Sequence, residues 1–286
     1  MISKINIPYE RRNAMKIGFI SDIHIDVNRE YNILEEISEH IKEENIDVVV
    51  IAGDISEDAQ TTIESMEKLE NLSQALIYYV PGNHDLWSDD LELLPTSVIY
   101  EKYKEDSRCL VDNPVLLKGD NETFALIGDI GWYDYTFGDS QFNISDFEKM
   151  NYKNRTFNDA IKNNWTMDNR GQSDYFLNKL ENQMEKHKEL PMILVTHMLP
   201  IEEFTVPKEQ KDWDYFNAYL GSNKLQKLYE KYPVKYAVCG HVHYRKEIEK
   251  KGIHYYCACL NYHNEWLSAA PNSKQQIREA FAYIEI

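Results

Sequence analysis

The segment DVVVIAGD, residues 47–54, indicates the fold class of this 286-residue chain. Its centre, Val48 to Ala52, is an uninterrupted apolar run of the length of one strand. A strand without polar alternation is typical of α/β proteins, in which parallel sheets are covered on both faces. We therefore predict a buried strand at this position, with Asp54 just beyond its carboxyl end.

The flanking segments continue the pattern. Residues 16–21 (KIGFIS) and the start of ALIYYVPGNHD, residues 75–85, also have the character of buried strands. Between the three strands, helical spacing of apolar residues predicts helices at 31–44 and 61–71. This alternation predicts a mostly parallel, layered sheet. Further strands are expected at 124–128, 192–196, 236–239, 253–258 and 281–284, and further helices at 172–187 and 222–231.

The chain shows no internal repeat, low-complexity tract or Gly/Ser linker, so we predict one domain over residues 1–286, with 1–14 as a candidate N-terminal extension. Residues 131–171 depart from the rhythm, since they are rich in asparagine and aromatic residues and long for a plain connection. Two interpretations remain open for this insert. It is a candidate cap insert that either adds helical packing to cap the domain or forms a lid that lines a pocket with aromatic walls.

Composition restricts the partners and the compartment. A net charge of -17 argues against binding of extended nucleic acid, which requires a basic surface. A small phosphorylated substrate remains compatible, because bound cations reverse the field locally. The four cysteines include no CxxC pair, and the chain shows neither a secretory signal nor an apolar run long enough to span a membrane. We therefore expect reduced thiols, a cytoplasmic location and no membrane partner; nothing in the sequence indicates an oligomeric state.

Polar side chains recur where the predicted strands end. Ligands bind at the carboxyl ends of the strands in open α/β sheets. Taken singly, an aspartate after a strand is usually a cap or turn residue, and a lone histidine is usually structural. Five successive strand ends with such residues point to a common site instead. The residues are Asp22 and His24, Asp54, Asn83 with His84 and Asp85, His197, and His241 with His243.

The order DxH, GD, GNHD, H, GHxH resembles the signature of the calcineurin-like metallophosphoesterases. The resemblance implies a four-layer α/β/β/α sandwich with two metal ions at the strand ends. One ion would be held by Asp22, His24, His243 and Asp54, and the other by Asn83, His197, His241 and Asp54. Two adjacent cations repel each other and need a shared anionic ligand, a role that suits Asp54. In an extended HxH segment the two side chains point the same way, so His241 and His243 are predicted to serve one ion each.

Oxygen and nitrogen ligands without thiolate suit manganese, iron, zinc or nickel. By the same resemblance, such a pair would lower the pKa of a bridging water and supply hydroxide for in-line attack on phosphorus. His84 is predicted to be the general acid that protonates the leaving group. Asp85 is predicted to orient the His84 imidazole.

The GNHD motif also indicates which branch of the metallophosphoesterase superfamily the chain resembles. The protein Ser/Thr phosphatases carry an arginine just before this stretch and end the motif in glutamate, whereas this chain has Pro81 and Asp85. The phosphodiesterase and small-molecule branches are therefore favoured. We predict hydrolysis of a phosphodiester or phosphomonoester of a small molecule. Two alternatives are a nuclease of the same superfamily and a non-catalytic scaffold for protein contacts, although a scaffold would be expected to have lost ligands.

Overall fold

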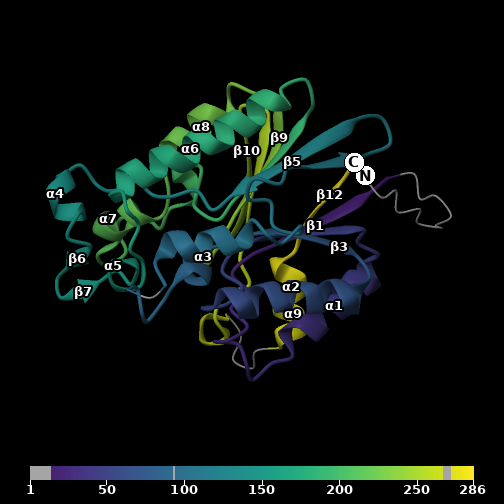
Figure 1. Cartoon of the computed structure of the whole chain (residues 1–286), viewed down its shortest axis with the longest axis horizontal. Helices are drawn as coiled ribbons and strands as arrows, with labels where there is room; N and C mark the ends of the chain where they lie inside the picture. Colours follow the sequence, from purple (N-terminus) through teal and green to yellow (C-terminus); the bar gives the residue numbers. More distant parts are fainter. Residues whose placement is uncertain (1–13, 93, 267–271) are drawn as a thin grey trace.

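The computed structural model describes residues 14–92, 94–266 and 272–286, so nearly all of the candidate extension at 1–14 lies outside the described residues. Two sheets form the centre of the molecule (Figure 1). The smaller sheet has the order β12-β1-β2-β3, and only β12 is antiparallel. Its strands are β1 (Lys16–Ile20), β2 (Val48–Ala52), β3 (Leu76–Val80) and β12 (Ala282–Glu285).

The larger sheet has the order β10-β11-β9-β8-β5-β4. Its four central strands are parallel, and its two edge strands pair antiparallel. The strands are β4 (Val115–Lys118), β5 (Thr123–Asp129), β8 (Met192–Thr196), β9 (Val234–Cys239), β10 (Arg245–Lys250) and β11 (Ile253–Ala258).

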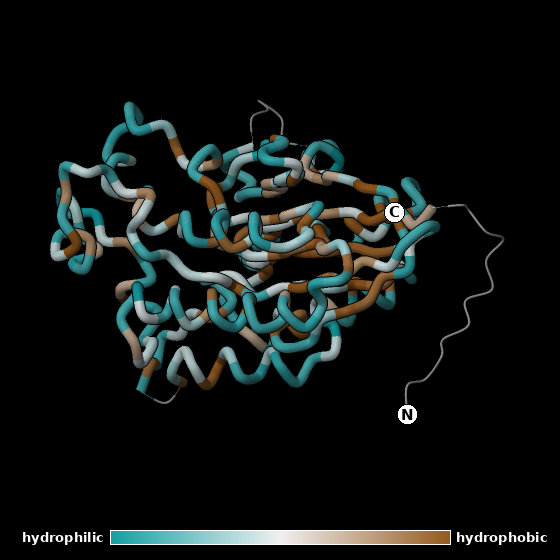
Figure 2. Tube along the Cα trace, turned by 90° about the horizontal axis from the view of Figure 1, so that it is seen from above, coloured by the Kyte–Doolittle hydropathy of each residue, from teal (hydrophilic) through white to brown (hydrophobic). Residues whose placement is uncertain are grey.

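Apolar side chains of the two sheets pack against each other to form the central core. Phe19 and Val50 from the smaller sheet and Val195 and Val238 from the larger one belong to this layer, and all are almost completely buried. Hydrophobic residues accordingly concentrate in the interior strands and hydrophilic residues along the outer helices (Figure 2). Continuous apolar strands such as β2 are explained by this double coverage.

Helices cover both outer faces (Figure 1), which confirms the predicted α/β/β/α sandwich. On the smaller sheet lie α1 (Ile33–Glu44), α2 (Ala59–Ser73) and α9 (Ser273–Ala280), and on the larger sheet α6 (Asn169–Lys186) and α8 (Asn223–Tyr229). Helix α3 (Thr96–Tyr103) packs beside α2. Short 3-10 turns are η1 (His84–Leu86), η2 (Glu202–Phe204), η3 (Asn217–Tyr219) and η4 (His263–Glu265).

Two edge strands and one helix that bury little apolar surface are among the elements that the sequence prediction missed, as was helix α3. Strand β10, RKEIEK, is a largely exposed edge strand, and charged residues are common on such edges. Strand β4 is the opposite edge and is mostly exposed. Helix α9 is hydrophilic apart from a narrow buried stripe that includes Ile277 and Ala280.

The insert at 131–171 contains α4 (Ile144–Phe147), β6 (Asn151–Tyr152), β7 (Arg155–Thr156) and α5 (Asp159–Lys162). Together with α7 (Trp213–Phe216) these elements gather at one end of the molecule (Figure 1). Its buried aromatic rings pack on one another and on Tyr219, as in the Phe157–Tyr219 stack with centroids 4.9 Å apart. The aromatic composition therefore supplies a local core.

Within the described ranges, no helix combines the length and the apolar character needed to cross a bilayer.

We expect stability to fall in acid partly through His40 of α1. Its side chain is buried, with Nε2 against the Tyr283 hydroxyl, and burial lowers the pKa of His40 below its ordinary 6.5; Glu44 and Arg278 act on it in opposite directions. Below pH 6.5 the unfolded chain therefore binds a proton that the folded chain does not. The contribution to stability is complete above pH 6.5 and is lost as the pH falls toward the folded pKa.

Urea unfolding between pH 5 and 8 measures this effect, and the His40→Gln protein should show a shallower decline in unfolding free energy than the wild type. The exposed His254 provides the control, since His254→Gln should leave the slope as it is. Equal slopes in all three proteins would contradict the assignment.

Candidate metal centre

The seven predicted ligands converge at the carboxyl ends of the parallel strands of both sheets. Five of them are at most 2% exposed, and the remaining two are His241 and His243 in the loop after β9. They are Asp22 and His24 after β1, Asp54 after β2, Asn83 after β3, and His197 after β8. Because the two sheets pack face to face, their strand ends meet at a single edge.

One group of ligand atoms gathers around His24. Its Nε2 lies 3.2 Å from His243 Nε2 and 3.7 Å from Asp54 Oδ2. His243 Nε2 is in turn 3.5 Å from Asp22 Oδ1. Three of these side chains, Asp22, His24 and His243, form a compact set of possible metal-binding groups.

A second group gathers around His197. Its Nε2 lies 3.3 Å from Asp54 Oδ2, 3.0 Å from Asn83 Oδ1 and 3.2 Å from His241 Nδ1. Asp54 therefore faces both groups, as a carboxylate shared by two cations must.

Hydrogen bonds fix the rings of two histidines in ligand orientation. His197 Nδ1 lies 2.8 Å from the Ala52 carbonyl oxygen, and His241 Nε2 lies 3.1 Å from the Tyr219 carbonyl oxygen. A ring nitrogen beside a carbonyl must donate, so we assign the proton to that nitrogen, and the lone pair of the other nitrogen faces the group.

His243 is oriented by a residue that no motif indicated. Its Nδ1 lies 2.6 Å from Glu265 Oε2, so Nε2 is free to face His24 and Asp22. We expect Glu265→Gln to weaken metal binding at this group about 10- to 100-fold, because a carboxylate partner makes the imidazole more basic. Competition against a fluorescent chelator measures the affinity, and Glu279→Gln, at an exposed glutamate paired with Arg245, is the matched control. Unchanged affinity in the Glu265 variant would refute the positioning role.

The backbone around the ligands is strained. Asp22, His24, Asp54, His241 and His243 all have positive φ, between 37° and 73°. This region is uncommon for residues other than glycine, and strained residues cluster at functional sites.

The glycines of the motifs permit close approach of the ligands. A Cβ at Gly82 would lie 2.1 Å from Asp54 Oδ1, and one at Gly240 would lie 2.4 Å from Asp22 Oδ2. Any side chain at either position would displace a carboxylate of the centre, which explains the glycine at these two positions.

The carboxylate and the imidazoles of the centre shift one another's pKa values. Burial lowers the pKa of His24 well below its ordinary value, and burial together with His197 lowers that of His241 to about 3. Burial opposes the ionisation of Asp54, but His197 and His84 outweigh it and hold the pKa of Asp54 well below its usual range. Burial opposes protonation of His197 and His243, but Asp54 raises the pKa of His197 to about 9 and Glu265 raises that of His243, so cations would displace protons from these two rings. Imidazole nitrogens beside an ionised carboxylate, with no thiolate, form a donor set that fits two transition-metal ions.

His84 lies beside the carboxylate of Asp54, at the edge of the two ligand groups. Its backbone N–H donates to Asp54 Oδ1 at 3.0 Å, and its Nε2 is 3.9 Å from Asp54 Oδ2. The imidazole stacks on Trp87 with centroids 3.5 Å apart, and its Nδ1 is 3.7 Å from Glu57 Oε1. The ring is thus held at the edge of the centre, where it lines the cavity while its Nδ1 is buried.

The role predicted for Asp85 is wrong. Its buried carboxylate accepts hydrogen bonds from Gly82 N at 2.7 Å, Ser56 N at 2.9 Å and Thr62 Oγ1 at 2.7 Å, and contacts the backbone of Ile55. These donors use both carboxylate oxygens, so Asp85 braces the loops after β2 and β3. Glu57, and not Asp85, places a carboxylate oxygen near His84 Nδ1, at 3.7 Å.

Further residues around the centre were missed because they lie in segments without a motif. Asp159 of the insert accepts from Asn83 Nδ2 at 3.0 Å and from Trp87 Nε1 at 2.7 Å, which turns Asn83 Oδ1 toward the second group. The Tyr262 ring lies 4.5 Å from that of His24. Only folding brings these positions near the ligands, because no pattern in the sequence links them to the ligand motifs.

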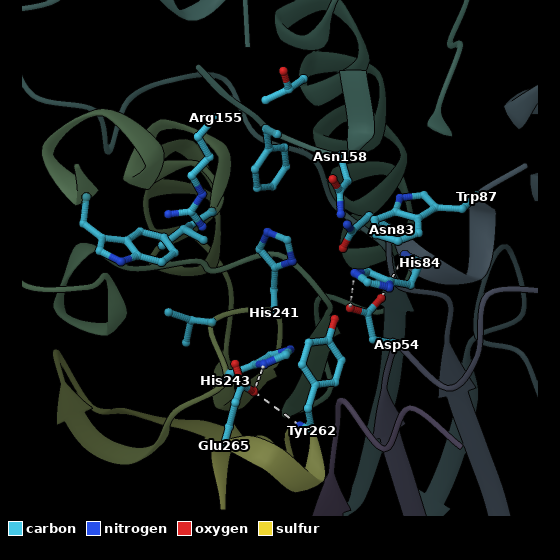
Figure 3. Close-up of a pocket in the computed structure, with 15 residues that line it drawn as sticks. Asp54, Asn83, His84, Trp87, Arg155, Asn158, His241, His243, Tyr262 and Glu265 are labelled. Atoms are coloured by element: carbon cyan, nitrogen blue, oxygen red, sulfur yellow. Dashed lines mark hydrogen bonds and ion pairs between the residues drawn. The ribbon is translucent and has the colours of Figure 1, made fainter. Parts of the chain in front are cut away.

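A cavity of about 310 Å³ opens over the centre (Figure 3). Asp54, Asn83, His84, His241 and His243 line its floor, and residues of the insert and of α7 line the opposite wall.

Comparison with known proteins agrees with this geometry. The family model of the calcineurin-like phosphoesterases matches residues 15–245. The uncharacterized protein L509 of Acanthamoeba polyphaga mimivirus is 26% identical over 94% of this chain and 96% of its own length. A Danio rerio transmembrane protein with a metallophosphoesterase domain is 32% identical over 94 residues, which span 31% of this chain and only 22% of that protein.

Solved structures share the fold. The phosphopantetheinyl hydrolase of Mycobacterium tuberculosis superposes with a TM-score of 0.73 at 17% identity, covering 92% of this chain and 95% of that one. A dimetal phosphatase from Danio rerio superposes with a TM-score of 0.50 at 14% identity, covering 86% and 87%. With the family model matched over most of its length, the chain belongs to the calcineurin-like phosphoesterase family.

Proposed function

We propose that this protein is a dinuclear metal-dependent phosphoesterase that hydrolyses a phosphodiester or phosphomonoester of a small molecule. The observation that carries the proposal is the position of Asp54, whose carboxylate faces two separate groups of nitrogen and oxygen ligands. Family membership supports the same reaction class.

Each residue of the centre has a proposed role. Asp22, His24, His243 and Asp54 would hold one cation, and Asn83, His197, His241 and Asp54 the other. When bound, two ions such as manganese, iron or zinc supply a water of lowered pKa as nucleophile and neutralise phosphate oxygens. His84, stacked on Trp87 at the cavity edge, is placed to donate a proton to the leaving alkoxide.

The cavity favours a small substrate over a nucleic acid. Its volume of about 310 Å³ is at the lower end of the range of small-molecule sites, and the chain carries a net charge of -17. The name of the phosphopantetheinyl hydrolase adds phosphopantetheine esters to the diesters worth testing. Four free, buried cysteines suit the cytoplasmic location that we propose for this activity.

A non-catalytic scaffold is the competing function, and the intact ligand set counts against it. Metal analysis of the purified protein, followed by a screen of phosphomonoesters and phosphodiesters with added manganese, distinguishes the two. We expect about two metal ions per chain and turnover of at least one ester class. Faster hydrolysis of bis(p-nitrophenyl) phosphate than of the monoester would assign the diesterase branch. Full metal loading without turnover of any ester would support the scaffold.

A further inference from the structure

Arg155 of the insert shares the cavity with the metal centre. Among the described residues that line this cavity, it is the only arginine or lysine. Figure 3 shows Arg155 on the wall above His241, while Glu265 and Tyr262 lie at the opposite end of the pocket. In a protein with a net charge of -17, a positively charged side chain in this cavity favours binding of a negatively charged ligand group.

The guanidinium of Arg155 is held by aromatic rings and leaves its N–H groups available. Its Cζ lies 4.4 Å from the Phe216 ring centroid and 5.6 Å from that of Trp213. Its backbone pairs with Tyr152 in the β6–β7 hairpin, but no hydrogen bond or ion pair joins its guanidinium to another residue within 14–92, 94–266 and 272–286. Its neighbour Lys153 differs, since it is paired with Asp212 at 2.8 Å and does not line the cavity. An arginine stacked on aromatic rings is preorganised for bidentate binding of a phosphate or carboxylate.

The position of Arg155 relative to the ligands is fixed by two anchors. Phe157 stacks on Tyr219, whose carbonyl oxygen accepts from His241. Asp159, four residues after Arg155, is hydrogen-bonded to the ligand Asn83. The segment that carries Arg155 is therefore tied to both sides of the second ligand group, and a substrate held there meets the guanidinium at a defined place.

The charge at the other end of the cavity indicates how a doubly anionic substrate would be oriented. Glu265, which is paired with His243, lines that end and would repel a second anion. We infer that Arg155 determines substrate specificity by binding a second anionic group, a phosphate or carboxylate, on the part of the substrate that points away from the metal centre. This inference rests on the proposed function and narrows it to phosphoesters that carry a further negative charge.

Matched substrates test the inference. Alkanediol monophosphates are compared with the bisphosphates and with ω-phosphooxy carboxylates of increasing chain length, each as the simple monoester and as the p-nitrophenyl diester. We expect wild-type kcat/KM to favour the doubly anionic member about 10- to 100-fold at one chain length, the range of a charged hydrogen bond. The comparison of phosphate with carboxylate identifies which anion Arg155 prefers.

Variants assign the preference to Arg155. In Arg155→Gln the ratio of doubly to singly anionic kcat/KM should fall to about one, and Arg155→Lys should retain part of it, because lysine keeps the charge but not the planar fork. Lys153→Gln removes a positive charge from the same hairpin and should leave the ratio as in the wild type.

Calorimetric binding of non-hydrolysable alkane diphosphonates and monophosphonates provides a readout that is independent of turnover. The wild type should bind the diphosphonate more tightly, and Arg155→Gln should not. Turnover of singly anionic esters without any preference for a second charge, or a preference that survives in Arg155→Gln, would overturn the inference and leave the proposed function standing. Absence of all turnover would overturn the proposed function, while the diphosphonate affinities would still decide the role of Arg155.

Discussion

The Asp54→Asn protein is expected to lose phosphoesterase activity roughly a thousandfold or more, the largest effect of any single substitution in the centre. Asp54 Oδ2 lies 3.7 Å from His24 Nε2 and 3.3 Å from His197 Nε2, so it is the anion common to both ligand groups. Asparagine keeps the shape and an oxygen that accepts from the His84 backbone N–H, but it removes the charge that offsets the repulsion between two cations. Metal content should therefore fall together with kcat.

Metal analysis by plasma mass spectrometry and hydrolysis assays at saturating manganese measure these two quantities. Asp47→Asn is the matched control, because Asp47 is an exposed aspartate at the other end of β2 that accepts from the Lys16 backbone N–H. Thermal unfolding of both variants separates loss of the site from loss of the fold. Two tightly bound ions and normal turnover in Asp54→Asn would contradict the assignment of Asp54 as the shared ligand.

The second large effect is expected for His84→Asn and should depend on the leaving group. A general acid contributes typically about 10²- to 10⁴-fold, so kcat for an alkyl phosphoester should fall by that factor. p-Nitrophenolate leaves as a stable anion and needs no proton, so its ester should be affected much less. His84 is assigned as the acid from its position. Its ring lies beside Asp54, lines the cavity and is held by its stack on Trp87.

Metal content decides how the His84 result is understood. If His84 donates a proton, the variant keeps both ions, and the exposed control His254→Asn keeps full activity. Equal losses for alkyl and p-nitrophenyl esters, accompanied by loss of metal, would instead show that His84 acts as a ligand. Its imidazole does form a compact group with His24 and Asp54.

The residues of the centre were predictable because each motif is local. A buried strand ends, a glycine follows, and a polar residue comes next, as in Gly53–Asp54 and Gly240–His241. Parallel strands bring such ends to one edge, so the sequence order alone predicts a common site. The glycines also have a physical explanation, since a Cβ at Gly240 would collide with Asp22.

The role of Asp85 shows where local reasoning fails. Its neighbour in sequence is His84, but its carboxylate turns toward the loops after β2 and β3 and the start of α2, where Ser56, Gly82 and Thr62 donate hydrogen bonds to it. A buried carboxylate takes the orientation that satisfies most of its hydrogen bonds, and these donors come from other segments of the chain.

By itself, the sequence determined the layered α/β class, the polar residues that follow the central strands and the reaction family. These features were readable because an apolar run and the residues that end it are encoded within a few positions. Only the tertiary structure decided which groups surround the ligands: Glu265 against His243, Asp159 against Asn83, and Arg155 across the cavity. Those partners depend on how distant loops pack over the strand ends, and no short-range pattern of residue types records that packing.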